Sequence, residues 1–291
     1  NVAGLKQGDP TTLTWSIVPD GTPIAGAIGE QPAPSNLRAF LLGIYGSDAA
    51  YLAVFQKVFD RWSELTGVTY VYEPNDDKAA LFGASGQLGV RADLRIGGHN
   101  IDGGYGVLAY NYYPNNGDMV IDTGDVFFTN TANDSLRLRN TVAHEHGHGL
   151  GLKHVVPCNT TKLMEPFITS GIFMVQPDEV RGAIGNYGDR YAGNHDYTSA
   201  VDFGNLTTPA LRSVIERDLG TNGFVVFING NNVLQDDYFR FTLSSAQNVT
   251  FTVTPTGQAG NQLQNDACAG AGSPINALEA GHLVFQVLSG P

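Results

Sequence analysis

The strongest constraint on this chain is the sequence HEHGHGLGLKH at residues 144–154. His144 and His148 are four residues apart, so on a helix both imidazoles leave one face and can bind the same ion. Gly151 allows a sharp turn, after which His154 returns as a third ligand. Three neutral nitrogens leave one position of a tetrahedral zinc for water, which is typical of a catalytic site. Glu145 is then placed to take a proton from that water and pass it to a leaving amine.

This spacing, HExxHxxGxxH, resembles the signature of the metzincin metallopeptidases, with all five defining positions filled. Leu163-Met164-Glu165-Pro166 is similar to the methionine-containing turn of that family. Met174 is a competing turn methionine, but its spacing from His154 is too long. His146 stands where the family usually has an apolar residue and points off the ligand face, which favours a structural or surface role.

The resemblance covers about residues 10–190 and is closest to the matrixin branch. It implies a zinc-dependent metalloendopeptidase, with Zn²⁺ held by His144, His148 and His154, Glu145 as the catalytic residue and Met164 in the structural turn. The rival hypothesis is a non-catalytic adhesion or binding module that retains the metal shell. The intact histidines, Glu145 and Met164 favour the enzyme.

The pattern of elements predicts an α/β or α+β layered fold for residues 1–190. The metzincin resemblance implies an α+β fold, in which a twisted, mostly parallel sheet with an antiparallel edge strand packs with helices. We expect strands at 13–18, 68–72, 93–96, 106–113 and 119–122, and helices at 48–66, 136–150 and 176–187. Short alternating runs then predict an all-β sandwich over residues 191–291. The chain stops just after a hydrophobic strand, which is consistent with a truncated sandwich.

The second part resembles the bacterial pre-peptidase C-terminal (PPC) type of β-sandwich, through DDYFRF at 236–241 and the run at 249–253. This resemblance implies help in export, anchoring or substrate binding, and a passive spacer is the alternative. Cys158 and Cys268 are the only cysteines in the chain. In an oxidising compartment they can form a disulfide that clamps the two parts together.

Charge and composition exclude several classes of partner. With 16 Lys+Arg against 28 Asp+Glu, the net charge is −12, the wrong sign for binding nucleic acid or an anionic membrane. No run of about 18 apolar residues is present, so we expect no transmembrane segment. Charged residues are only 15% of the chain, and few lysines with many Asn, Thr and Gly residues fit a secreted protein. We expect an extracellular monomer that acts on protein or peptide substrates.

The resemblance also places the substrate. Residues 106–110 look like the family's antiparallel edge strand, to which an extended peptide can add itself. Backbone groups of Leu108 and Ala109 are expected to bind it. The pocket that gives specificity is expected to be walled by the segment after Met164, including Pro166 and Phe167.

A structural Ca²⁺ site is predicted at a glycine-rich turn. Calcium binds about 6–8 oxygens, both carboxylate and carbonyl. The matrixin layout implies side-chain oxygens of Asp102, Asp122 and Asp125, and carbonyl oxygens of Gly103, Tyr105 and Val107. Matrixins also carry a structural zinc, but Tyr110 and Val120 stand where two of its histidines would fall, leaving His99 almost alone. We therefore expect that second zinc to be absent.

Overall fold

The computed structural model describes residues 4–156, 160–191, 193–194, 196–206, 226–228, 231–233, 238–246, 248–251, 259–262 and 273–276. Cys158 and Cys268 lie outside these residues. The disulfide between them therefore stays a prediction.

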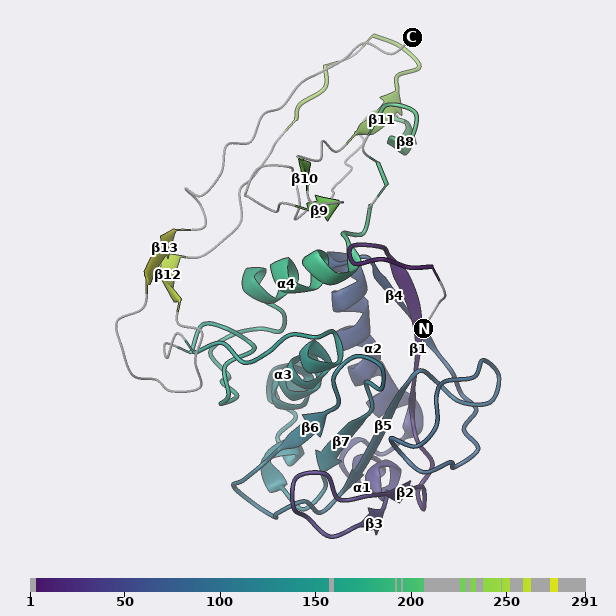
Figure 1. The fold of residues 1–291 in the computed structure, drawn as a ribbon, viewed down its shortest axis with the longest axis vertical. Coiled ribbons are helices and arrows are strands. Elements are labelled where there is room, and N and C mark those ends of the chain that lie inside the picture. The colour runs from purple at the N-terminus through teal and green to yellow at the C-terminus, as the bar shows by residue number, and fades with distance from the viewer. Residues whose placement is uncertain are drawn as a thin grey trace.

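A five-stranded sheet forms the centre of the first part of the chain (Figure 1). Its strand order is β4 (Val68–Tyr72), β1 (Thr11–Ile17), β5 (Leu94–His99), β7 (Met119–Asp122) and β6 (Ala109–Asn111). Neighbouring strands are parallel from β4 to β7, and β6 is antiparallel to β7 at one edge. This confirms the predicted mostly parallel sheet with an antiparallel edge strand, although β6 is shorter than expected. A small antiparallel pair, β2 (Pro23–Ile24) and β3 (Ala33–Pro34), stands apart from this sheet.

The helices agree with the sequence pattern except for one. The helix α2 (Asp48–Leu65) begins at the predicted residue, and Ser47 caps it by accepting a hydrogen bond from the Ala50 N–H. The helix α4 (Pro177–Tyr187) opens on a capping box between Gln176 and Glu179. The unpredicted helix is α1 (Leu37–Tyr45). Its N-cap residue makes no side-chain hydrogen bond to the helix. A short 3-10 helix, η1 (Val126–Thr129), precedes α3.

The helix α3 (Ala132–Gly149) carries the motif. Its first residues are not right-handed helix, because Asn133, Asp134 and Ser135 all have φ between 53° and 59°. The regular helix therefore runs from Leu136, as the sequence predicts. It packs against α2 and against the edge strand β6, so the motif lies beside the open edge of the sheet (Figure 1).

Alternating residues of the strands build two different surfaces. One face packs on the helices, where Trp15 and Phe59 have ring centroids 4.6 Å apart in the main core. The opposite face bears a smaller cluster that includes Ile24, Leu81 and Val120. On that second face Arg95 lies fully buried beneath the loop after β4 and pairs with Asp76.

The described residues beyond 191 form three separate strand pairs. These are β8 (Val201–Asn205) with β11 (Phe239–Thr242), β9 (Val226–Ile228) with β10 (Asn231–Val233), and β12 (Ala259–Gln262) with β13 (Ser273–Asn276). Residues 249–251, expected in a strand, lie outside any strand. The predicted sandwich is thus not established by the described residues and stays a prediction.

Within the described residues, no single helix is both long enough and apolar enough to cross a membrane. Only α1 and α2 counted together reach that length and composition, and they meet at a bend of 102°.

Candidate active site

The three motif histidines converge on one point. The Nε2 atom of His154 lies 3.2 Å from Nε2 of His144 and 3.2 Å from Nε2 of His148. The outer nitrogens of the two helical histidines face main-chain carbonyls, with His144 Nδ1 2.6 Å from the Leu163 oxygen and His148 Nδ1 2.8 Å from the Leu152 oxygen. A ring N–H that donates to a carbonyl leaves the other nitrogen as a lone pair. The Nε2 lone pairs of His144 and His148 are therefore free to bind an ion at the point where they meet His154.

This arrangement fits a zinc ion. Nitrogens held at about 2.0–2.1 Å from a tetrahedral zinc are about 3.3 Å from one another. The two measured separations of 3.2 Å match that value. Burial lowers the pKa of His144 to about 3 and also lowers the pKa of His148, which keeps both rings neutral, as metal ligands must be. Gly151 has φ +92°, so the turn that returns His154 does use a conformation suited to glycine.

Glu145 lies next to the first histidine on α3 and is only 7% exposed. Burial raises the pKa of its carboxyl to about 8. A cation held by the neighbouring histidines opposes that shift, because an opposite charge favours the carboxylate.

The two glycines inside the motif helix allow close packing. A Cβ at Gly147 would lie 2.5 Å from the Met164 sulfur, and a Cβ at Gly149 would lie 2.9 Å from Asn111 Nδ2. Each glycine costs an α-helix about 1 kcal/mol relative to alanine. In return for this loss of helix stability, the helix contacts the Met164 turn directly on one side and the edge strand on the other.

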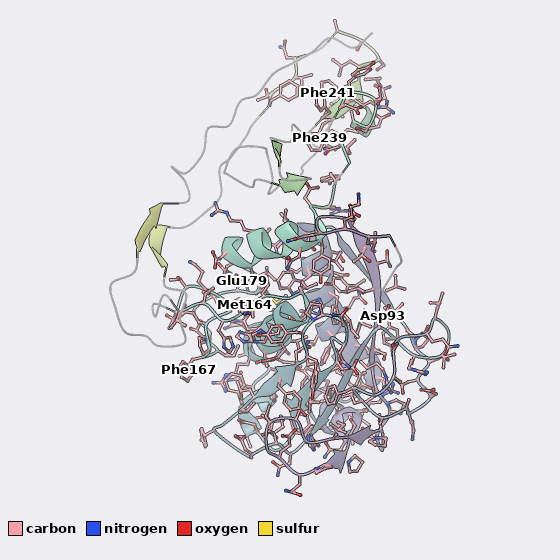
Figure 2. The ribbon with its side chains drawn as sticks, in the orientation of Figure 1. Asp93, Met164, Phe167, Glu179, Phe239 and Phe241 are labelled. Atoms are coloured by element: carbon pink, nitrogen blue, oxygen red, sulfur yellow. The ribbon has the colours of Figure 1, made fainter. Side chains whose placement is uncertain are left out.

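Met164 lies under the motif helix, where the resemblance places the turn methionine. Met164 is 2% exposed, and its N–H donates to Glu179 Oε1 at 3.0 Å. Both residues are labelled in Figure 2. Burial raises the pKa of Glu179 to about 7. The sequence marked Glu179 only as part of a helix start, and its contact with the methionine turn was not anticipated.

His146 is structural, as its position off the ligand face predicts. It is 1% exposed and hydrogen-bonds the Tyr70 hydroxyl through Nε2. The rings of Phe59, Trp62 and Tyr70 surround it at centroid distances of 5.3, 6.0 and 5.0 Å. It fastens the motif helix to α2 and β4.

The edge strand presents alternating backbone groups to its open side. The Leu108 carbonyl accepts from the Asp122 N–H, and the Tyr112 N–H donates to the Asp118 carbonyl, each at 2.9 Å. In an antiparallel pair, alternate residues of a strand turn their N–H and C=O groups away from the neighbouring strand. Ala109 and Asn111 therefore face the open edge, whereas the Leu108 carbonyl is used within the sheet. Asn111 was not singled out from the sequence.

The predicted calcium residues lie together around the turn that follows β5. Val107 N–H donates to Asp102 at 3.0 Å, Tyr105 N–H to Asp125 at 3.2 Å, and Asp102 N–H to Asp122 at 3.4 Å. Asp122 and Asp125 are 0% and 4% exposed. In the described part of the chain, no Lys, Arg or His forms an ion pair with either carboxylate.

His99, left alone in the comparison with the structural zinc of matrixins, is buried in β5. Its Nε2 lies 3.7 Å from Glu30 Oε1. The Tyr110 hydroxyl donates to the same carboxylate at 2.7 Å. The absence of a second zinc remains a prediction.

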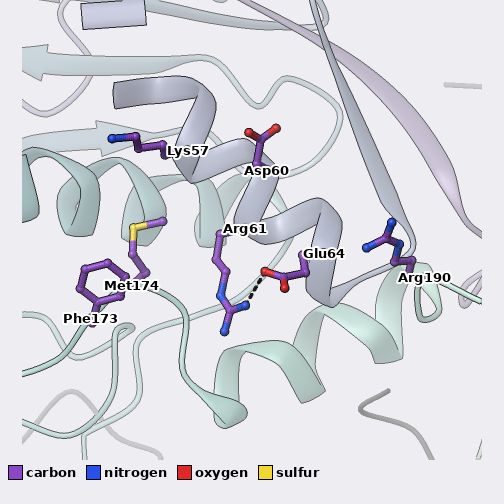
Figure 3. Close-up of a pocket in the computed structure, with 7 residues that line it drawn as sticks. All are labelled: Lys57, Asp60, Arg61, Glu64, Phe173, Met174 and Arg190. Atoms are coloured by element: carbon purple, nitrogen blue, oxygen red, sulfur yellow. Dashed lines mark hydrogen bonds and ion pairs between the residues drawn. The ribbon is translucent and has the colours of Figure 1, made fainter. Parts of the chain in front are cut away.

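A pocket on another part of the surface is lined by neither the motif residues 144–154 nor the predicted calcium residues. It lies between α2 and residues 173–174 (Figure 3), and Arg61 and Glu64 form an ion pair within it. Its lining is Lys57, Asp60, Arg61, Glu64, Phe173, Met174 and Arg190. We assign it no part in the reaction.

Comparison with known proteins agrees with the geometry of the site. Residues 46–188 match the family model of the matrixins, peptidase family M10. This segment is thus similar to a matrixin domain. The hatching enzyme of Paracentrotus lividus is 27% identical over 143 residues, which make up 46% of this chain and 22% of that protein. The chain thus spans about a fifth of the length of that curated relative.

Among solved structures, an archaemetzincin from Methanopyrus kandleri aligns at 16% identity over 48% of this chain and 80% of that chain. Its TM-score of 0.28 is too low to add to the assignment. The matrixin match includes His144, His148 and His154, the three residues that the structure groups as a possible metal site.

Proposed function

We propose that the chain is a secreted zinc-dependent endopeptidase. The observation that carries this proposal is the convergence of the His144, His148 and His154 Nε2 atoms at the spacing of zinc ligands. Zinc bound there supplies a Lewis acid for the scissile carbonyl and lowers the pKa of a water to about 7.

The residues of the chain divide the remaining work. Glu145 accepts the proton of the attacking water on its carboxylate and returns it to the nitrogen of the leaving amine. Ala109 and Asn111 offer N–H and C=O groups to a peptide that binds as an added antiparallel strand. Leu108 is the other expected contact. Its carbonyl accepts a hydrogen bond within the sheet, so this carbonyl is not available to bind substrate.

The decisive experiment compares two glutamates of similar burial. Glu145→Gln keeps the side-chain volume and should lower kcat by about 10²- to 10⁴-fold, the usual contribution of one acid–base group, with zinc content unchanged. Glu73→Gln is the control, because Glu73 is also a glutamate of low exposure, at 5%, but lies outside the motif and accepts hydrogen bonds from Asn75 and Gly89 in the loop after β4.

Cleavage of casein and gelatin is measured with and without 1,10-phenanthroline. A zinc-loaded wild-type protein that cuts neither substrate favours the non-catalytic binding module. Equal rates for Glu145→Gln and wild type would refute the assigned mechanism.

We also propose a structural calcium ion at Asp102, Asp122 and Asp125, with carbonyls of Gly103, Tyr105 and Val107. Two buried carboxylates that lie at one turn without a cationic side chain among the described residues support this proposal. Backbone N–H groups also donate to both of them, three to Asp122 and two to Asp125. The ion would join the turn before β6 to the end of β7 and so hold the edge strand on which substrate should lie.

The wider organisation belongs to the same proposal. Residues 1–190 would be the catalytic domain and 191–291 a PPC-like β-sandwich, in an extracellular monomer that acts on protein substrates. The acidic, lysine-poor composition supports secretion, and the strand pairs beyond residue 191 support a β-rich second part. Limited proteolysis followed by mass spectrometry would locate the boundary.

A further inference from the structure

The segment between Met164 and Gln176 is closed at its base by one side chain. Glu179 Oε1 accepts the Met164 N–H at 3.0 Å, and Glu179 Oε2 accepts the Gln176 N–H at 2.9 Å. Between these ends, residues 166–173 carry no charged side chain, and Phe167 and Phe173 are 79% and 60% exposed. A loop of this length with its ends held together packs on its own side chains, and such loops are often functional.

Asn140 holds the same segment from the inside. Its amide nitrogen donates to the Thr169 carbonyl at 3.0 Å and the Ile172 carbonyl at 3.1 Å. Its amide oxygen accepts the Met174 N–H at 2.8 Å. The side chain is 1% exposed, and both of its hydrogen-bonding groups are used on this one loop.

The backbone at the end of the loop is strained. Met174 has φ +56°, a left-handed conformation that a residue with a side chain rarely adopts. Such conformations persist only where the surrounding structure imposes them, and they cluster at ligand-binding and active sites. The hydrogen bond from Met174 to Asn140 is one of the contacts that impose it.

Asn140 also lies one helical turn before the first motif histidine, so the two side chains leave the same face of α3. His144 contacts the carbonyl of Leu163, where the segment begins, and Asn140 contacts residues 169–174, where it ends. Two successive turns of α3 therefore fix the position of the loop relative to the histidine that can bind the metal.

We propose that Asn140 is a positioning residue that sets substrate preference by holding the 165–175 segment against the motif helix. The inference rests on the proposed endopeptidase function and on the expectation that the segment after Met164 walls the pocket that gives specificity. Asn140 touches neither metal nor substrate. It acts by keeping the pocket wall at one distance from the reacting atoms.

The test uses Asn140→Leu, which keeps the shape of the side chain and removes all three hydrogen bonds. Thr141→Val is the matched control, because Thr141 is equally buried on α3 but bonds only the Arg137 carbonyl of its own helix. Both variants and the wild type, as full chains loaded with zinc, are assayed on a peptide series that varies the residues on either side of the cleaved bond. Zinc content and hydrogen exchange of residues 165–175 are measured alongside.

For Asn140→Leu we expect unchanged zinc content, faster exchange in the segment, and a ratio of best to worst kcat/KM reduced at least about fivefold, the weight of one typical hydrogen bond. Thr141→Val should keep the wild-type ratio. An unchanged ratio in a folded Asn140→Leu, or an equal reduction in Thr141→Val, overturns the inference.

Two further outcomes are decided in advance. If Asn140→Leu does not fold, Asn140→Ser replaces it, since a serine hydroxyl is too short to reach all three backbone groups. In the wild type alone, exchange of the Met174 amide as fast as that of an unbonded amide also overturns the inference. A wild type that cuts no peptide refutes the proposed function, and this inference with it, whereas selective wild-type cleavage with an unaltered variant refutes this inference alone.

Discussion

Replacing Asp76 with asparagine should destabilise this protein far more than the same change at its neighbour Asp77. Both carboxylates pair with arginines of the same region. Arg95 donates to the two oxygens of Asp76 at 2.8 Å each, with both side chains 0% exposed. Arg91 binds Asp77 at 2.9 Å, with the arginine 15% and the aspartate 42% exposed.

The expected magnitudes follow from this difference in burial. Removing one partner of a buried pair costs about 3–5 kcal/mol, because the other charge stays buried without compensation. The guanidinium of Arg95 keeps its 2.8 Å hydrogen bond to the Ala79 carbonyl, so we expect Asp76→Asn near the lower limit, about 3 kcal/mol. The exposed pair contributes about 0–1 kcal/mol. With a urea m value of about 1–3 kcal/mol/M, Asp76→Asn should lower the midpoint by about 1–3 M.

Urea unfolding followed by tryptophan fluorescence measures both variants, since Trp15 and Trp62 are buried in the core of this domain. The double replacement Arg95→Met with Asp76→Leu removes both charges and should cost less than either single change. Equal midpoint shifts for Asp76→Asn and Asp77→Asn would refute the argument from burial.

Three further changes test other parts of the site. Met164→Leu nearly conserves volume, so it should cost less than about 1.5 kcal/mol and leave zinc bound; a folded variant without zinc would show a role beyond packing. Burial raises the pKa of Glu179 from 4.5 to about 7, so the folded state binds this proton more tightly and its stability should fall as pH rises through that window. At about 1.4 kcal/mol per pH unit, the total loss reaches about 3 kcal/mol. The difference in unfolding free energy between Glu179→Gln and the wild type should therefore change by about 3 kcal/mol across this pH range. A constant difference from pH 4.5 to 7.5 would contradict this prediction. Calcium should raise the melting temperature of the zinc-loaded protein and should not do so in Asp122→Ala, whereas coincident melts of the wild type with calcium and with EGTA would exclude the site.

Local spacing explains what could be predicted about the active site. The interval between His144 and His148 places two imidazoles on one helix face in any fold that keeps the helix. Gly151 marks the turn that returns His154, and the structure shows the positive φ that such a turn requires. The strands β4 and β7 were predicted residue for residue, because turn residues bound each short apolar run.

Other features depend on chain segments that only folding brings together. Asn140 reaches a loop 29 to 34 residues away, and the carbonyl that orients His144 is 19 residues away. The left-handed residues before Leu136 and the unpredicted α1 show the same limit, since no local signal marks them. The sequence around Asn140 is the same whether its side chain is solvated or holds a loop, so the sequence cannot distinguish the two.

By itself, then, the sequence determined which residues can bind a metal ion and where the longer helices and several strands begin, whereas the antiparallel edge was expected from the family resemblance. Only the tertiary structure decided which carbonyls orient the imidazoles, which glycines of α3 admit Met164 and Asn111, and which carboxylates are buried with or without a cation. The physical reason is range. Ligand spacing on a helix is set by covalent geometry over four residues, whereas burial and hydrogen-bond partners are set by packing among distant segments.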